Sequence, residues 1–218
     1  MSESNQPGVV VSVNLAEMRK VPMGDLVYDT GIWKLPVEGP VGVKELGLVG
    51  DRQGDLNVHG GLRKAVYVYA EEDNRWWEVQ LGRRVTPGSF GENLTLRGVA
   101  ITGALIGERW RIGSAEFEVT QPRQPCWKLG LRMEDPQLPN RFSEANRPGA
   151  YLSVVKEGGL AAGDTVEILE RPAHPVTIGL MGFLIYNDHR LAQLVQENLE
   201  RDLSPKEWKE FLRVKLAS

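Results

Sequence analysis

Cysteine and histidine are scarce in this sequence. Cys126 is the only cysteine among 218 residues, and the three histidines, His59, His174 and His189, form no H-x-x-x-H pair. A single cysteine excludes an intrachain disulfide, and it excludes any zinc or iron–sulfur site that is built from several cysteines. A disulfide-stapled fold and a Cys-rich metal centre are therefore both ruled out.

Long apolar runs and a strong net charge are also missing. No run approaches the roughly 20 apolar residues of a membrane span, and the polar stretch Met1–Gly8 lacks the apolar core of a signal peptide. The net charge of −3 and the pI of about 5.7 give no reason to expect a nucleic acid or a membrane surface as a partner. We therefore expect a cytoplasmic protein, with neither a nucleic-acid polymer nor a membrane among its partners.

The sequence has the ordinary composition of a globular protein, with 41% hydrophobic and 25% charged residues. Short apolar runs alternate with Gly, Pro, Asn and Asp through most of the chain, which is typical of an all-β body. Gly113-Ser114 suits a two-residue hairpin turn. The predicted strands are Val9–Leu15, Val41–Leu48, Ala65–Ala70, Ala104–Ile112, Ala115–Gln121, Tyr151–Lys156 and Asp164–Glu170.

Helical patterns occur twice within this body and dominate after it. Within the body, Glu71–Leu81 and the shorter Trp127–Met133 read as helices. Near the C-terminus, apolar residues recur at helical spacing, Asn187 or Asp188 is placed as an N-cap, and Ser204–Glu207 forms a capping box with Pro at the first helical position. The predicted C-terminal helices are Val176–Tyr186, Asp188–Glu200 and one that begins after Ser204. We expect a disordered tail over residues 1–8, a β-barrel domain over residues 9–171 and a three-helix domain over residues 172–218.

Three Gly- or Pro-rich clusters are candidates for chemistry. In the first, His59-Gly60-Gly61 precedes a strand, so exposed backbone N–H groups can approach an anion, and Arg63 and Lys64 add positive charge. Taken alone, this pattern more often marks a polar loop with a surface histidine. The second cluster, Pro87–Leu94, is a constrained turn that holds Glu92 and Asn93, and it matches no nucleotide-binding loop.

The third cluster, Gln121–Leu129, contains the lone cysteine. Two prolines fix the backbone around Arg123 and place Cys126 at the start of a predicted helix. A thiol beside Arg123 and Lys128 gains thiolate character, and a thiolate is a ligand for soft metals. An inert cysteine is the alternative, but such a residue usually lies among apolar neighbours.

In this order, the clusters resemble the YiiM-type proteins of the MOSC domain family. The resemblance spans almost the whole chain, including the C-terminal helices with Leu203-Ser204-Pro205 and Trp208. The stretches that carry it are Thr30–Lys34, Pro36–Val41, Gly47–Asp51, His59–Gly61, Lys64–Tyr69, Phe90–Leu94, Gln121–Leu129, Gly149–Leu152 and Ala162–Asp164. It implies a mainly β fold, a MOSC-type barrel with a few short helices, followed by a small three-helix C-terminal unit.

The resemblance also implies chemistry. It implies a positively charged pocket for the molybdenum cofactor (molybdopterin), with Cys126 as the metal ligand and with His59 and Arg123 as the other catalytic residues. Asn93, Arg123 and Lys128, together with Arg63 and Lys64 near the cofactor phosphate, would bind the cofactor. A family-wide association with pyridoxal phosphate is assigned to no residue here. Arg63 departs from the pattern, because relatives usually have Asp after His-Gly-Gly.

The expected activity is the reduction of N-hydroxylated compounds such as hydroxylaminopurines, amidoximes and hydroxamates. The sequence has no flavin, haem or iron–sulfur motif, so the electrons would come from a separate flavin or iron–sulfur protein. His59 is the expected proton donor, since an unperturbed histidine titrates near neutrality. The alternatives are a carrier of the molybdenum cofactor or of sulfur, without turnover, and a non-catalytic barrel for a small ligand.

Overall fold

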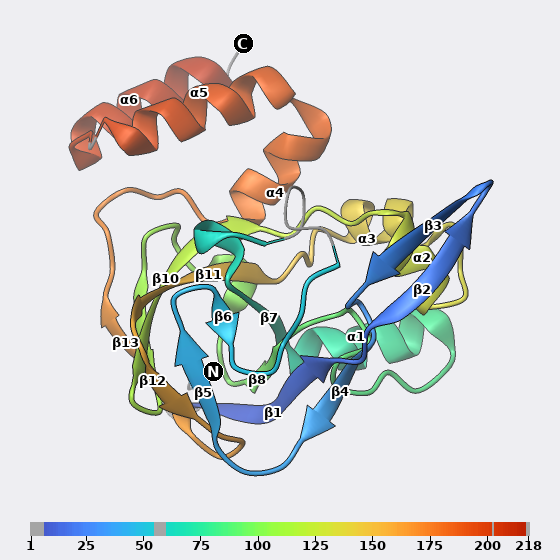
Figure 1. The fold of residues 1–218 in the computed structure, drawn as a ribbon. Helices are drawn as coiled ribbons and strands as arrows, with labels where there is room; N and C mark the ends of the chain where they lie inside the picture. Colours follow the sequence, from blue (N-terminus) through green and yellow to red (C-terminus); the bar gives the residue numbers. More distant parts are fainter. Residues whose placement is uncertain (1–6, 55–59, 202, 217–218) are drawn as a thin grey trace.

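The computed structural model describes residues 7–54, 60–201 and 203–216, and it shows a closed seven-stranded β-barrel (Figure 1). The barrel strands follow the order β13-β9-β10-β11-β7-β8-β1, and the pairing of β1 with β13 closes the ring through Gly8↔Val166 and Val9↔Thr165. All neighbouring strands are antiparallel except β7 and β8, which are parallel and joined by α1 (Glu71–Leu81). The barrel strands are β1 (Gly8–Ala16), β7 (Val66–Ala70), β8 (Leu94–Arg97), β9 (Arg109–Ile112), β10 (Ala115–Pro122), β11 (Ala150–Lys156) and β13 (Thr165–Glu170). A closed ring leaves no exposed barrel edge.

Alternation along the strands separates two hydrophobic clusters. In β7, Val66 and Val68 point into the barrel core, while Tyr67 and Tyr69 belong to a second, aromatic cluster outside it. This aromatic cluster comprises Tyr67, Tyr69, Trp77, Val85, Phe90, Leu129, Met133, Leu138 and Phe142. Because β7 is covered on both sides, all five of its residues are buried.

Additional short strands extend beyond the barrel. β4 (Lys34–Val37) pairs with β1, β2 (Arg19–Met23) and β3 (Leu26–Thr30) form a projecting hairpin, and β12 (Gly158–Leu160), β5 (Val41–Lys44) and β6 (Gly47–Leu48) form a small sheet (Figure 1). The sequence had not predicted β2, β3, β4, β8 or β12.

Two predicted strands were wrong in extent. Val41–Leu48 is a hairpin of β5 and β6 rather than one strand, because Gly47 has a φ of +129° and a Cβ at that position would collide with the Ala65 carbonyl. In Ala104–Ile112 only β9 (Arg109–Ile112) forms, since a turn at Ile106-Gly107, with a φ of +89° at Gly107, interrupts the extended backbone. The strands β1, β7, β10, β11 and β13 match their predictions to within one or two residues.

The helices lie in two groups on different sides of the barrel (Figure 1). α1, α2 (Trp127–Arg132) and α3 (Leu138–Ala145) cover the aromatic cluster, and α4 (Ile178–Asn187), α5 (His189–Glu200) and α6 (Pro205–Leu216) form the C-terminal group. Short 3₁₀ turns span Leu62–Lys64 and Ile101–Gly103. α1 matches its prediction at both ends, whereas α3 had not been predicted.

The C-terminal helix starts follow local sequence rules. Asp188, not Asn187, is the N-cap of α5, and its side chain accepts a hydrogen bond from the Leu191 backbone N–H. The capping box at α6 is confirmed, because the Glu207 carboxylate accepts from the Ser204 backbone N–H at 2.9 Å. α4 begins two residues later than predicted, at Ile178.

Gly8, predicted to lie in the tail, is the first residue of β1, and residues 1–6 lie outside the described part of the chain.

In the described residues, no helix combines the length and the apolar composition needed to cross a membrane.

Candidate functional site

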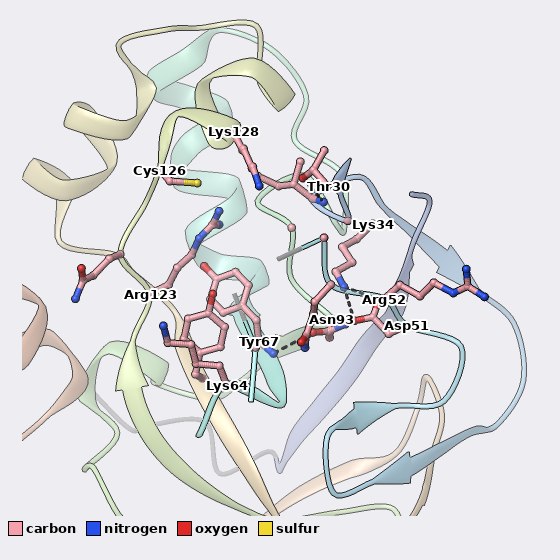
Figure 2. A pocket seen from close by; sticks show the side chains of 18 residues that line it. Thr30, Lys34, Asp51, Arg52, Lys64, Tyr67, Asn93, Arg123, Cys126 and Lys128 are labelled. Atoms are coloured by element: carbon pink, nitrogen blue, oxygen red, sulfur yellow. Dashed lines mark hydrogen bonds and ion pairs between the residues drawn. The ribbon is translucent and has the colours of Figure 1, made fainter. Parts of the chain in front are cut away.

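A pocket opens where the ends of several barrel strands meet α2 and the base of the β2–β3 hairpin (Figure 2). Its cavity volume is about 100 Å³, and the cavity is continuous with open space at the surface. We call it the central pocket. Its described lining residues are Thr30, Gly31, Ile32, Lys34, Asp51, Arg52, Gln53, Gly54, Gly60, Lys64, Tyr67, Gly91, Asn93, Arg123, Gln124, Cys126, Lys128 and Tyr151.

Cys126 lies in the pocket wall at the junction of β10 and α2. Its backbone is extended and forms the N-cap of α2, with its carbonyl accepting from the Leu129 N–H at 2.9 Å. The thiol is only partly buried, and in Figure 2 its sulfur faces the same space as the Lys128 ammonium and the Arg123 guanidinium. The lone cysteine is therefore accessible and surrounded by cationic groups.

Arg123 is a buried cation beneath this space. One of its N–H groups donates to the Phe90 carbonyl, and its guanidinium carbon lies 5.1 Å from the centre of the Tyr67 ring. Burial alone would lower the pKa of Arg123, but the facing Tyr67, Tyr151 and Cys126 outweigh it and hold the pKa above its ordinary value. Arg123 thus remains charged in the pocket at any physiological pH.

The turn that supplies the Phe90 carbonyl is organised by a buried carboxylate. Glu92 accepts from the Gly88 N–H at 2.7 Å, from the Phe90 N–H at 3.0 Å and from the Thr95 hydroxyl at 3.0 Å. Burial raises the pKa of Glu92, while these hydrogen bonds oppose the rise. Glu92 therefore fixes the turn over residues 88–91, and this turn holds Arg123.

A buried ion pair forms another part of the wall. Both Asp51 oxygens lie 2.5 Å from the Lys34 ammonium, and Asp51 also accepts from the Asn93 amide and the Ala16 backbone N–H, each at 2.8 Å. Burial lowers the pKa of Lys34, and the attraction of Asp51 opposes this shift. Asn93 extends the network, because its amide oxygen accepts from the Tyr67 backbone N–H at 3.1 Å.

The charges that line the central pocket are strongly unbalanced. Among the described residues, five cationic side chains line it, those of Lys34, Arg52, Lys64, Arg123 and Lys128, against one carboxylate, that of Asp51. Asp51 pairs with Lys34, so it does not offset the positive charge that Arg123 and Lys128 place near Cys126 (Figure 2). Such a pocket suits an anionic ligand.

The structure brings together most of the residues that the sequence singled out. Cys126, Arg123, Lys128, Asn93 and Lys64 all line the central pocket. Arg63 does not, because its side chain is exposed and only its carbonyl is held, by the Thr120 hydroxyl at 2.6 Å. His59 lies outside the described residues.

Sequence reasoning assigned no role to four residues that shape the pocket. These residues are Lys34, Asp51, Tyr67 and Tyr151, and each lies within a stretch that resembles the MOSC proteins. Asp51 follows the Gly47–Gly50 run, which leads into the first Gly-rich cluster, but nothing in that pattern indicated its ion pair with Lys34. Tyr67 and Tyr151 are cross-strand partners in β7 and β11, with ring centres 5.2 Å apart. The strand register decides that both side chains point toward the central pocket, and no short motif reveals that register.

Comparison with known proteins assigns the chain to a protein family. The MOSC domain family model matches residues 55–167, and the chain belongs to this family. MOSC domains are generally associated with binding of the molybdenum cofactor, so membership indicates a function related to this cofactor.

Particular relatives extend the likeness beyond the domain. The chain is 30% identical to YflK of Bacillus subtilis over 92% of its own length and 90% of the relative. It is 30% identical to YiiM of Escherichia coli over 74% and 72% of the two chains. The crystal structure of YiiM from Geobacillus stearothermophilus matches with a TM-score of 0.73 and 28% identity, covering 96% of this chain and all of that one.

A fungal relative carries an enzyme name. A protein of Gibberella moniliformis called a reductase is 30% identical over 77% of this chain. The match spans only 30% of that longer protein, so the name describes a polypeptide with much additional sequence. Together with the family, it indicates a possible oxidoreductase activity.

Proposed function

We propose that the central pocket binds the molybdenum cofactor with Cys126 as the protein ligand of the metal, and that the loaded protein reduces N-hydroxylated compounds. The observation that carries the proposal is the position of the only thiol of the chain in a pocket with an excess of cations. Membership of the MOSC family supports the choice of cofactor.

The residues of the pocket fit the chemical parts of this cofactor. The cofactor has an anionic phosphate and anionic sulfur donors, which match the positive charge of Lys64, Arg123 and Lys128. Its pterin ring is flat and aromatic, which matches the paired rings of Tyr67 and Tyr151. A thiolate at Cys126 adds a soft ligand for the metal.

When bound, the cofactor supplies a metal that exchanges two electrons and accepts oxygen. The overall reaction balances as R–NHOH + 2 e⁻ + 2 H⁺ → R–NH₂ + H₂O. Arg123 keeps its positive charge in the pocket and stabilises negative charge that develops on the substrate. His59 remains the sequence-based prediction for the proton donor. A separate flavin or iron–sulfur protein remains the predicted source of the two electrons.

The test combines metal analysis with turnover. We would express the wild type and Cys126→Ser in a host that makes the cofactor, and measure molybdenum per protein and the reduction of 6-hydroxylaminopurine with a chemical reductant. The proposal expects roughly one molybdenum per wild-type chain, turnover by the wild type, and loss of both in Cys126→Ser. Lys44→Met, on an exposed residue outside the pocket, is the control and should retain both.

The outcomes separate the alternatives. Full retention of molybdenum and activity in Cys126→Ser would refute the assignment of the ligand. Molybdenum bound at Cys126 without reduction of any N-hydroxylated compound would instead identify a cofactor carrier. A wild type without molybdenum would leave a barrel for another small anion.

A further inference from the structure

The C-terminal helices contact the barrel mainly through α4, and this contact lies directly behind the central pocket. Gly182 of α4 is buried, and a Cβ built on it would lie 2.9 Å from the Asn146 side-chain oxygen. The same Cβ would be 3.4 Å from Pro148 and 3.7 Å from Pro122. At Gly182, α4 therefore packs against the side chains of Asn146, Pro148 and Pro122, and an added methyl group would displace the Asn146 side chain.

Each of the contacted segments leads to a residue of the pocket. Pro122 immediately precedes Arg123, and it pairs with Ala150 in the barrel sheet. The Pro148 carbonyl accepts a hydrogen bond from the Tyr67 hydroxyl at 2.8 Å. The same segment continues into β11, where Tyr151 lies opposite Tyr67.

Asn146 connects α4 to these segments by a direct hydrogen bond. It ends α3 in a left-handed conformation with a φ of +47°, which asparagine tolerates better than most residues. Its side-chain N–H donates to the Gly179 carbonyl of α4 at 3.0 Å, while its side-chain oxygen faces Gly182. One side chain thus contacts two successive turns of the helix.

The segment 146–149 is held from the barrel side as well. Besides the bond from Tyr67, the Tyr69 hydroxyl donates to the Arg147 carbonyl at 2.9 Å. Gly149 has a φ of +64°, and a Cβ there would lie 2.5 Å from the Val68 carbonyl. With the barrel on one side and α4 on the other, the segment has little room to move.

We propose that α4 braces the central pocket, with Gly182 and Asn146 as positioning residues that hold Arg123, Tyr67 and Tyr151 in place. In this assignment the C-terminal helices act on the site through packing, without contacting the ligand. The brace is a property of the protein alone, and only the molybdenum measurement below rests on the proposed function.

The test adds one methyl group to α4 at this contact. Gly182→Ala should speed amide hydrogen exchange at least threefold in peptides covering residues 120–128 and 146–152, and should lower bound molybdenum at least threefold. Alanine favours a helix more than glycine does, so these losses cannot come from weaker helix formation in α4.

Gly42→Ala is the matched control. It places a Cβ 3.0 Å from the Val49 side chain, which is a similar side-chain crowding on β5, and neither residue lines the pocket. It should leave both readouts within about 1.5-fold of the wild type, with both variants measured well below their melting temperatures.

A second substitution keeps the result interpretable if Gly182→Ala is only unstable. Asn146→Gly removes the side chain that bonds to Gly179 and keeps the left-handed backbone, and it adds no crowding to α4. On its own it should speed exchange in the same two segments and lower bound molybdenum, in the same direction as Gly182→Ala.

The proposal is overturned if Gly182→Ala affects exchange only within α4, if the control produces the same losses, or if Asn146→Gly leaves both segments as protected as in the wild type. A wild type that lacks molybdenum would refute the proposed function instead, and the exchange data on the cofactor-free protein would still decide on the brace.

Discussion

Replacing Asp51 by asparagine should destabilise the fold by about 3–5 kcal/mol at pH 7, the usual cost of removing one partner from a buried ion pair. The side chains of Asp51 and Lys34 are only 5% and 7% exposed, so solvent screens their interaction very little. Asparagine also presents an NH₂ group to donors. If this group takes the place of Oδ2, it faces the donors of Lys34 and Asn93. If it takes the place of Oδ1, it faces the Ala16 backbone N–H. At least one buried donor therefore stays unpaired in the variant.

The pH dependence of this loss provides a second check. The folded-state pKa of Lys34 lies below its ordinary 10.5, so between these two values the unfolded chain binds more protons and stability rises with pH. Without Asp51 only the weaker attraction of Glu92 opposes the lowering of the Lys34 pKa by burial, and the window extends to lower pH. The difference in stability between the variant and the wild type should therefore shrink as the pH rises from 7 to 9.5.

Urea unfolding followed by tryptophan fluorescence measures both effects, since Trp77 and Trp110 are buried. The double variant Lys34→Met/Asp51→Asn is the control, because it removes the buried cation that Asp51→Asn leaves unpaired and keeps an amide oxygen for Asn93 or Ala16, so it should lose less stability than Asp51→Asn alone. A loss below about 1 kcal/mol for Asp51→Asn at pH 7, or a loss that grows towards pH 9.5, would show that the pair is not buried as described.

Two further predictions concern other parts of the fold. Phe142→Ala removes a buried ring that stacks on Trp77 at 6.0 Å, so it should cost about 3–5 kcal/mol in urea unfolding and weaken the near-ultraviolet circular dichroism, whereas an unchanged spectrum would contradict the ring stacking. Hydrogen bonds from Ser204 lower the pKa of Glu207, so this carboxylate stabilises the start of α6 above the ordinary pKa of 4.5, and the effect is lost as the pH falls through the lowered value. Amide exchange in the first turn of α6, corrected for intrinsic rates, should therefore rise between pH 6 and pH 3, and Glu207→Gln should remove most of this dependence.

Local patterns predicted the elements that depend on local interactions. α1 ends as expected at Leu81, before Gly82, whose φ of +63° suits a helix C-terminus. The capping box of α6 and the hairpin turn at Gly113 formed as predicted for the same reason. Where prediction failed, a turn inside an apolar run was the cause, as at Gly47 and Gly107. α3 escaped prediction because its helix is supported mainly by packing of Leu138 and Phe142 into the aromatic cluster.

The candidate site likewise has one part that local sequence predicted and one part that it did not. Cys126, Arg123 and Lys128 are close in sequence, so their proximity followed from the prolines and the expected helix. Tyr67 and Tyr151 could not be found in this way, because a shift of one residue in strand register would turn both side chains to the opposite face.

The sequence by itself determined that the only thiol of the chain follows a strand, stands beside cations and belongs to an ordered set of segments typical of MOSC proteins. Those features depend on residues within a few positions of one another. The tertiary structure alone decided that Lys34, Asp51 and Tyr151 share a pocket with Cys126, and that α4 packs behind it. Barrel closure between β1 and β13 and the register of the strands fix these contacts, and both arise from packing of the whole chain.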